Sequence, residues 1–161
     1  MPDEDRRDFR AELRSARQCA AARPPDSPKR KNDPVPKQIL TTHDAPSSTL
    51  YSQGVRAGQF LFVSGMVGID AATTQLVGTT IQAQTHQALR NCLAIVETGG
   101  GTLNDVVQVT VLLANPGDFA GMNEAYAQVF TTDPPTRAVS KLGVELPGVL
   151  VSIALTAYLD R

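Results

Sequence analysis

Several residue types that mark particular protein classes are scarce or missing in this chain of 161 residues. It has no tryptophan and two histidines, and its two cysteines, Cys19 and Cys92, fit neither a disulfide framework nor a metal-ligand spacing. His43 and His86 have no cysteine or histidine partner at metal-binding spacing. We therefore expect neither a metal nor another cofactor, and we expect Cys92 to be a small core residue.

Long apolar runs are also absent. No stretch approaches the roughly 20 apolar residues of a membrane span, and the acidic start of the chain lacks the features of a secretory signal. These absences predict a soluble, cytoplasmic protein without a membrane partner. A mitochondrial presequence stays open because arginines recur between Arg6 and Arg17, although the acidic residues among them argue against that acid-poor class.

Charge and proline content change near residue 37. Residues 1–37 contain ten basic and seven acidic residues, a net charge of +3, whereas residues 38–161 contain five basic and nine acidic residues, a net charge of −4. Five prolines between Pro24 and Pro36 break helical structure. We interpret residues 1–37 as a disordered or linker-like extension and residues 38–161 as one domain. The negative domain argues against strong nucleic-acid binding.

The domain alternates strand-like and helix-like segments. Residues 59–64, 105–113, 138–144 and 149–159 are rich in β-branched, aromatic or other apolar residues and predict strands. Helical spacing of apolar residues predicts helices from Thr79 or Thr80 to Glu97 and from Asp118 to Phe130. This order predicts an α+β fold with two helices on one face of a mixed sheet.

Two helices cover only one face of such a sheet. The segment Val149–Leu159 is apolar on both of its faces, so the uncovered side is expected to meet another subunit. The alternative is that the N-terminal extension folds over this face, but its prolines and charges argue against that arrangement.

Arg137 is one of very few basic residues in the second half of the chain. After Arg90, the basic residues are Arg137, Lys141 and Arg161. A guanidinium group binds a carboxylate through two parallel hydrogen bonds, which a lysine cannot reproduce. Arg137 therefore predicts a small carboxylate ligand. The alternative is that Arg137 caps a strand end or pairs with Glu145, and spacing alone does not separate the two.

Seven short motifs stand in a recognisable order between residues 38 and 160. They are Tyr51-Ser52-Gln53-Gly54, Phe62-Val63-Ser64-Gly65, Gln84-Thr85 with Asn91, Asn104-Asp105-Val106-Val107, Asp118-Phe119 with Met122-Asn123 and Tyr126, Pro135 with Arg137, and Leu146-Pro147. Together they resemble the reactive intermediate deaminase family, also called RidA or YjgF. The resemblance implies a chorismate-mutase-like α+β fold and a homotrimer with clefts between subunits. It also implies hydrolysis of 2-imino or enamino acids to 2-oxo acids and ammonia without a cofactor.

The resemblance also assigns roles to particular residues. Arg137 matches the family arginine that binds the substrate carboxylate, and Tyr51 matches a tyrosine at the cleft. Ser64 and Gly65 match a strand-end pair whose backbone approaches the ligand, and Asn123 matches a polar helix residue nearby. Structural alternatives exist for two of them, because a tyrosine after a turn can bury its ring and an asparagine on a helix can face water.

One departure from the family pattern concerns the chemistry. Ser152 stands where the deaminase branch carries a glutamate proposed to hold the attacking water, and Ala154 replaces a second common glutamate. A serine hydroxyl can orient water but cannot accept a proton as a carboxylate does. The first hypothesis is therefore a divergent imine deaminase with Arg137, Tyr51 and Ser152 as its catalytic residues. The alternative is a non-catalytic trimeric module that binds a small carboxylate metabolite. An endoribonuclease, a name also used in this family, is disfavoured by the charge of the domain.

Overall fold

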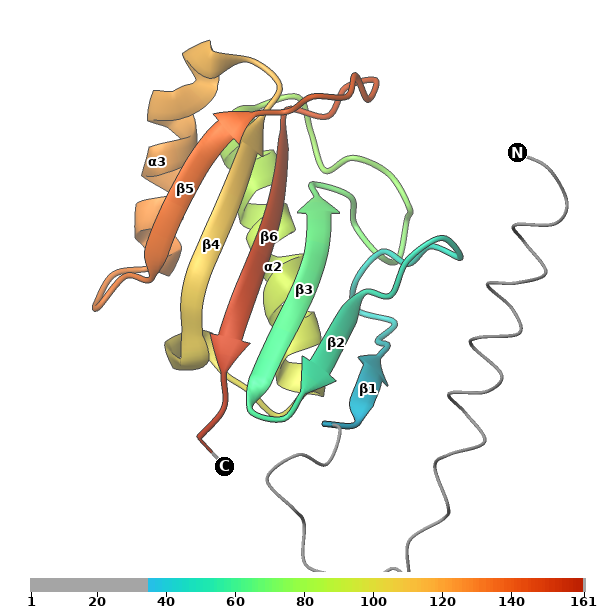
Figure 1. Ribbon diagram of the computed structural model, residues 1–161. Coiled ribbons are helices and arrows are strands. Elements are labelled where there is room, and N and C mark those ends of the chain that lie inside the picture. The colour runs from blue at the N-terminus through green and yellow to red at the C-terminus, as the bar shows by residue number, and fades with distance from the viewer. Residues whose placement is uncertain (1–34, 161) are drawn as a thin grey trace, which may run out of the picture. The chain divides into compact units, whose positions relative to one another are not determined.

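The computed structural model describes residues 35–160. Most of the predicted extension therefore lies outside the described residues, but Lys37, its last residue, already belongs to the first strand. The described part is a six-stranded sheet in the order β1-β2-β3-β6-β4-β5 (Figure 1). The strands are β1 Lys37–Leu40, β2 Gly54–Ala57, β3 Phe60–Val67, β4 Val106–Leu113, β5 Thr136–Lys141 and β6 Val151–Tyr158.

Four of the five strand pairs are antiparallel, and β4 and β5 are parallel. The parallel pair needs a crossover, which α3 (Phe119–Val129) provides between β4 and β5. A 3-10 turn at Pro116–Asp118 leads into α3, and Asn115 accepts a hydrogen bond from the Gly117 amide at 3.0 Å there. A second 3-10 turn, Leu103–Asp105, precedes β4.

The longer helix, α2 (Ile81–Thr98), begins where the threonines predict it. The Thr80 hydroxyl accepts a hydrogen bond from the Ala83 amide at 3.3 Å, which satisfies one of the free donors of the first turn. The helix ends at Gly99. The burial of its polar residues is less predictable from the sequence, because Gln84, Thr85 and Asn91 are fully buried.

Both helices lie on one face of the sheet, and the core fills the space between the two layers (Figure 1). Leu89 of α2, Met122 of α3, and Val109 and Ile153 of the sheet are fully buried there. The predicted α+β architecture with a mixed sheet and two helices on one face is confirmed.

The strands differ from the prediction in three places. The sequence did not predict β1 and β2, and β5 starts at Thr136, so Arg137 lies inside a strand rather than before one. β3 continues past Gly65, where we expected it to end. The pairings Val63↔Leu155 and Met66↔Ile153 leave Ser64 and Gly65 together opposite one residue of β6, which is a β-bulge.

The other face of the sheet carries no helix among the described residues, and aromatic side chains gather on it. Phe60, Phe62 and Tyr158 are 46%, 49% and 36% exposed. The Phe60 ring centroid lies 6.2 Å from that of Phe62 and 5.3 Å from that of Tyr158. We call this side of the sheet the open face.

Candidate functional site

The six residues that the sequence predicts for the site fall into two groups. Tyr51, Ser64, Gly65 and Ser152 gather around the bulge of β3, and we call them the bulge group. Arg137 on β5 and Asn123 on α3 belong to a different part of the molecule.

The bulge brings Gly65 against Ser152. A Cβ atom built on Gly65 would lie 2.9 Å from the Ser152 Oγ atom, closer than real Cβ contacts come. Gly65 is therefore required here by the approach of the neighbouring strand as well as by any ligand. Any residue larger than glycine would have to displace the Ser152 hydroxyl.

The loop that carries Tyr51 is tied to the same bulge. The Ser64 hydroxyl donates to the Ser52 carbonyl at 2.7 Å, and the Ser64 amide donates to the Gln53 carbonyl at 3.0 Å. The Gln53 amide group, itself 3% exposed, donates to the Ala45 carbonyl at 2.7 Å and so holds the far side of the loop. Tyr51 is half-exposed, so its ring is not buried in the core as the structural alternative required.

Ser152 has a largely apolar setting. Its partners across the sheet are Val67 of β3 and Leu112 of β4, and its side chain is 8% exposed. Neither partner can take a proton from the hydroxyl, which therefore stays protonated and is only a very weak proton acceptor. Ser152 can orient a water molecule through a hydrogen bond, but it cannot serve as the general base of a hydrolysis.

Arg137 packs against α3 through three side chains. Its Cζ atom lies 4.6 Å from the ring centroid of Tyr126 and 6.0 Å from that of Phe119. Its Nη1 atom lies 4.0 Å from the Met122 sulfur. Within residues 35–160 Arg137 forms no ion pair with Glu145, so that structural alternative is wrong. The side chain remains exposed, and its charge is available for an anion.

The surface of α3 beside Arg137 contains two buried oxygen atoms without hydrogen-bond partners, Asn123 Oδ1 and Tyr126 Oη. Asn123 lies four residues after Phe119 and three before Tyr126, a spacing that places it on the same helix face as both rings. Burial raises the pKa of Tyr126, and the positive charge of Arg137 partly opposes this shift. The Tyr126 hydroxyl is therefore a neutral group.

Arg137 and Ser152 project from opposite faces of the sheet in one chain. Arg137 is in register with Val109, which is in the core, whereas Ser152 is in register with Leu112, which points the other way. Two strand spacings and three residues separate them, which places their Cα atoms roughly 14 Å apart. Within a single chain, Arg137 and Ser152 are therefore too far apart to contact the same small ligand.

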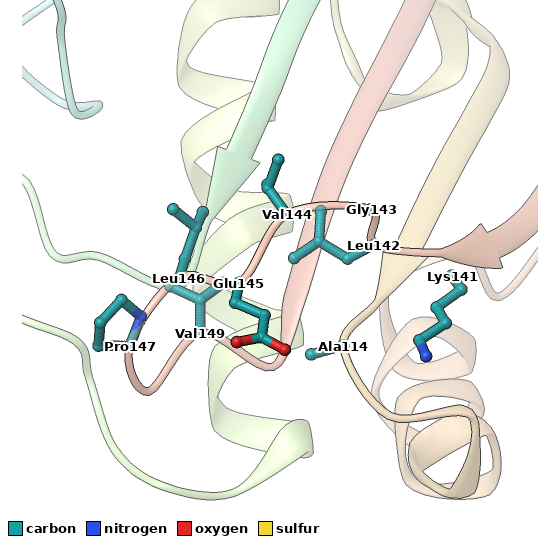
Figure 2. A pocket seen from close by; sticks show the side chains of 9 residues that line it. All are labelled: Ala114, Lys141, Leu142, Gly143, Val144, Glu145, Leu146, Pro147 and Val149. Carbon is teal, nitrogen blue, oxygen red and sulfur yellow. The ribbon is translucent and has the colours of Figure 1, made fainter.

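A hollow of about 810 Å³ contains none of the predicted site residues in its lining. It lies at the ends of β4 and β5, under the loop that leads to β6 (Figure 2). Neither Arg137 nor Ser152 lines it, so its size alone does not mark the site. Its lining residues are Ala114, Lys141, Leu142, Gly143, Val144, Glu145, Leu146, Pro147 and Val149.

Metal binding and membrane insertion are two further possibilities that residues 35–160 can be compared with. Between residues 35 and 160, no three His, Cys, Asp or Glu side chains come together in a way that could hold a metal ion. In the same part of the chain, no helix has the length and hydropathy to cross a membrane.

Sequence reasoning did not assign Phe119, Met122 and Tyr126 to the site. Their helical spacing predicted only that they face the core, which is correct for Met122 and Tyr126. Phe119 instead is 45% exposed and lies beside Arg137. The signal that could have found them is the pairing of an arginine on a strand with an aromatic face on the crossover helix immediately before it.

Comparison with known proteins places the domain in a family. The family model described as Endoribonuclease L-PSP matches residues 42–159. A RutC family protein of Pyrococcus horikoshii is 42% identical over 123 residues, which cover 76% of this chain and 98% of that protein. The 2-iminobutanoate/2-iminopropanoate deaminase of Mus musculus is 34% identical, and the match covers 75% of this chain and 90% of that enzyme.

A solved structure shows the same fold. The E. coli protein TdcF, crystallised with bound serine, superimposes with a TM-score of 0.72 and 30% sequence identity. The match covers 76% of this chain and 99% of TdcF. The family model, the relatives and the shared architecture agree with one another, and the chain belongs to the RidA/YjgF family of reactive intermediate deaminases.

Proposed function

We propose that this protein hydrolyses reactive 2-imino and enamino acids to 2-oxo acids and ammonia. The observation that carries the proposal is Arg137, an exposed guanidinium group that stacks on α3 and has no carboxylate partner among the described residues. Family relatives named 2-iminobutanoate/2-iminopropanoate deaminase support the reaction class. The related TdcF structure with bound serine supports a small ligand that carries a carboxylate.

The reaction needs little from the protein besides orientation. An enamino acid first takes up a proton at C3 and becomes the iminium form, whose C2 atom is strongly electrophilic. Water adds to C2, one proton moves from the added oxygen to nitrogen, and the C2–N bond then breaks to release ammonia. The second proton of the added oxygen passes to solvent, which balances the proton taken up at C3 and leaves the 2-oxo acid. Arg137 would hold the carboxylate with two parallel hydrogen bonds and fix C2 relative to the water.

Ser152 and the bulge of β3 would form the part of the site that holds the attacking water. The hydroxyl can donate to or accept from the attacking water, and the Gly65 backbone can approach the ligand because it has no side chain. Because no carboxylate stands at position 152, we expect slower hydrolysis than a variant with a glutamate there would show.

A complete site would combine two copies of the chain. Arg137 and the bulge group lie on opposite faces of the sheet, so we propose that a second copy packs on the open face and places its own residues opposite the first. A homotrimer with three such clefts fits the exposed aromatic side chains of the open face. The bulge group and Arg137 would then meet between subunits.

The proposal is tested with imines that an amino-acid oxidase generates in place from several amino acids. Arg137→Ala should lower kcat/KM at least 100-fold, since it removes a bidentate charged contact of about 3 kcal/mol. Arg137→Lys serves as the matched control, because lysine keeps the positive charge but cannot form the two parallel hydrogen bonds. This variant should retain intermediate activity. Equal activity in all three proteins would overturn the role of Arg137.

A second candidate function is favoured by one observation, the serine at position 152. The same cleft could bind a small carboxylate metabolite without hydrolysing it. If the wild type binds a 2-oxo acid but releases no ammonia, and Ser152→Glu gains turnover, the binding function is correct and the deaminase proposal is wrong.

A further inference from the structure

We propose that Tyr126 is the positioning residue for Arg137, and that its aromatic ring, rather than its hydroxyl, holds the guanidinium group in the orientation that receives a carboxylate. This inference rests on the proposed function of Arg137 as the carboxylate grip. It concerns a residue that makes no contact of its own with the ligand.

The need for a positioning residue follows from the place of Arg137. In the described chain β5 is an edge strand, paired only with β4, so a single backbone neighbour fixes it. The Arg137 side chain is exposed. A long exposed side chain on an edge strand samples many rotamers, and holding it in one of them costs conformational entropy.

Side chains of α3 hold the Arg137 side chain in place, which the edge strand alone does not do. The Arg137 Cζ atom lies 4.6 Å from the Tyr126 ring centroid, within the range of a cation–π contact, while the Phe119 ring lies farther away at 6.0 Å. Tyr126 itself is 6% exposed, and its ring packs against Phe130 at a centroid distance of 4.6 Å. The surface under the guanidinium is therefore part of the rigid core.

Stacking also decides which part of the guanidinium remains available. An aromatic ring covers the flat face of the group, and its N–H donors point outward in the plane. A carboxylate approaches in that plane and accepts two parallel hydrogen bonds. Tyr126 thus fixes the orientation of the Arg137 guanidinium group without occupying the N–H groups that bind the carboxylate.

The hydroxyl of Tyr126 is not needed for this role. Its oxygen is buried and has no hydrogen-bond partner among the described residues. Tyr126→Phe removes this oxygen and keeps the ring, whereas Tyr126→Leu keeps an apolar side chain and removes the ring. The two variants separate the ring from the hydroxyl, and Phe119→Leu tests the second, more distant ring at an exposed position.

The first measurement is direct and independent of turnover. The Nε–Hε signal of Arg137, assigned in the full-length protein with Arg137→Lys, should be shifted by the ring current of Tyr126. The shift should persist in Tyr126→Phe and move to the ordinary arginine position in Tyr126→Leu. An unchanged signal in folded Tyr126→Leu would overturn the proposed contact.

The second measurement is binding of pyruvate and 2-oxobutanoate, used as carboxylate probes that cannot be hydrolysed. Tyr126→Leu should weaken their binding about tenfold, Phe119→Leu about twofold, and Tyr126→Phe should bind as the wild type does. In the imine assay, the change in Tyr126→Leu should fall on KM, with kcat within threefold of the wild type. Thermal unfolding curves identify the temperature at which every variant is folded. If Tyr126→Leu does not fold, Tyr126→Phe still tests the inference, because loss of probe binding in that variant would overturn it.

The outcomes distinguish this inference from the function on which it rests. Tight probe binding in folded Tyr126→Leu, or loss of binding in Tyr126→Phe, would overturn the positioning role. A wild type that binds the probes through Arg137 but does not hydrolyse imines would refute the deaminase and support the positioning role. A wild type that binds no carboxylate would refute both.

Discussion

Gly99 occupies a position where a single methyl group has no room. A Cβ atom there would overlap the Leu61 side chain and lie 2.9 Å from Leu40, and both leucines are in the core. The backbone of Gly99 has an ordinary φ of −81°, so the constraint is steric rather than conformational.

Gly99→Ala should therefore destabilise the protein by about 1–3 kcal/mol through overpacking. Gly143→Ala is the matched control, because a Cβ atom at Gly143 meets nothing within 4 Å. It should leave stability within about 0.5 kcal/mol of the wild type. Thermal unfolding midpoints at one fixed protein concentration provide the comparison, and equal midpoints for the two variants would contradict this account.

The candidate site shows how far single residues could be interpreted from the sequence. Arg137 stands out in the sequence because a guanidinium in an apolar, charge-poor segment suggests an anion, and its role as a ligand-binding residue stays a prediction. Tyr126 and Phe119 could not be connected with it, because their spacing on α3 indicates a buried helix face without saying which strand crosses it. The separation of Arg137 from Ser152 on two faces also needed the register of β4 against β5 and β6, which the sequence does not specify.

The loop between β5 and β6 is held by one buried side chain of α2. The Gln84 amide donates to the Gly78 carbonyl at 2.9 Å and to the Gly148 carbonyl at 2.8 Å, and its oxygen accepts from the Leu150 amide at 2.9 Å. These bonds tie the start of the helix to the turn that leads into β6 and Ser152.

Gln84→Leu should lower the free energy of unfolding by roughly 1–3 kcal/mol, because it removes the partner of three partly buried backbone groups. Gln82→Leu is the control on the same helix, since Gln82 bonds only the exposed Glu124 carboxylate, at 3.0 Å, among the contacts of the described residues. Its effect should stay within about 0.5 kcal/mol. Urea unfolding measures both, and a Gln84→Leu protein as stable as Gln82→Leu would show that water replaces the amide.

Helices and long strands were predictable from the sequence, whereas short strands and buried polar residues were not. α2, α3, β4 and β6 have enough apolar residues at regular spacing to reveal their periods. β1 and β2 have four residues each, and β2 is only partly buried, so neither shows a recognisable alternation. Gln84 and Asn91 are polar residues in a helix that a hydrophobic pattern would place at the surface, but backbone carbonyls of neighbouring loops bind both of them.

Among the described residues, one face of the sheet packs against the helices, and the open face carries polar residues such as Ser152 and Thr156 beside its exposed aromatic side chains. Phe62→Glu places a charge in the exposed aromatic cluster, beside Phe60, and should convert the proposed trimer to monomers, because an unpaired carboxylate cannot be buried at low cost. Ala127→Glu, at an exposed position of α3 on the helix side, should leave the trimer intact. Sedimentation velocity at matched concentrations distinguishes the two masses, and a Phe62→Glu protein that stays trimeric would show that subunits meet elsewhere.

The sheet order has a consequence for synthesis of the chain. β6 follows the other five strands in sequence, yet it lies between β3 and β4 in the sheet. Until the ribosome has released Tyr158, β3 and β4 each lack a neighbour, and the two halves of the sheet cannot join. The sheet can therefore close only after β6 has left the ribosome, and a nascent chain that stalls before Val151 presents unpaired strand edges and apolar surface to the chaperones of the cell.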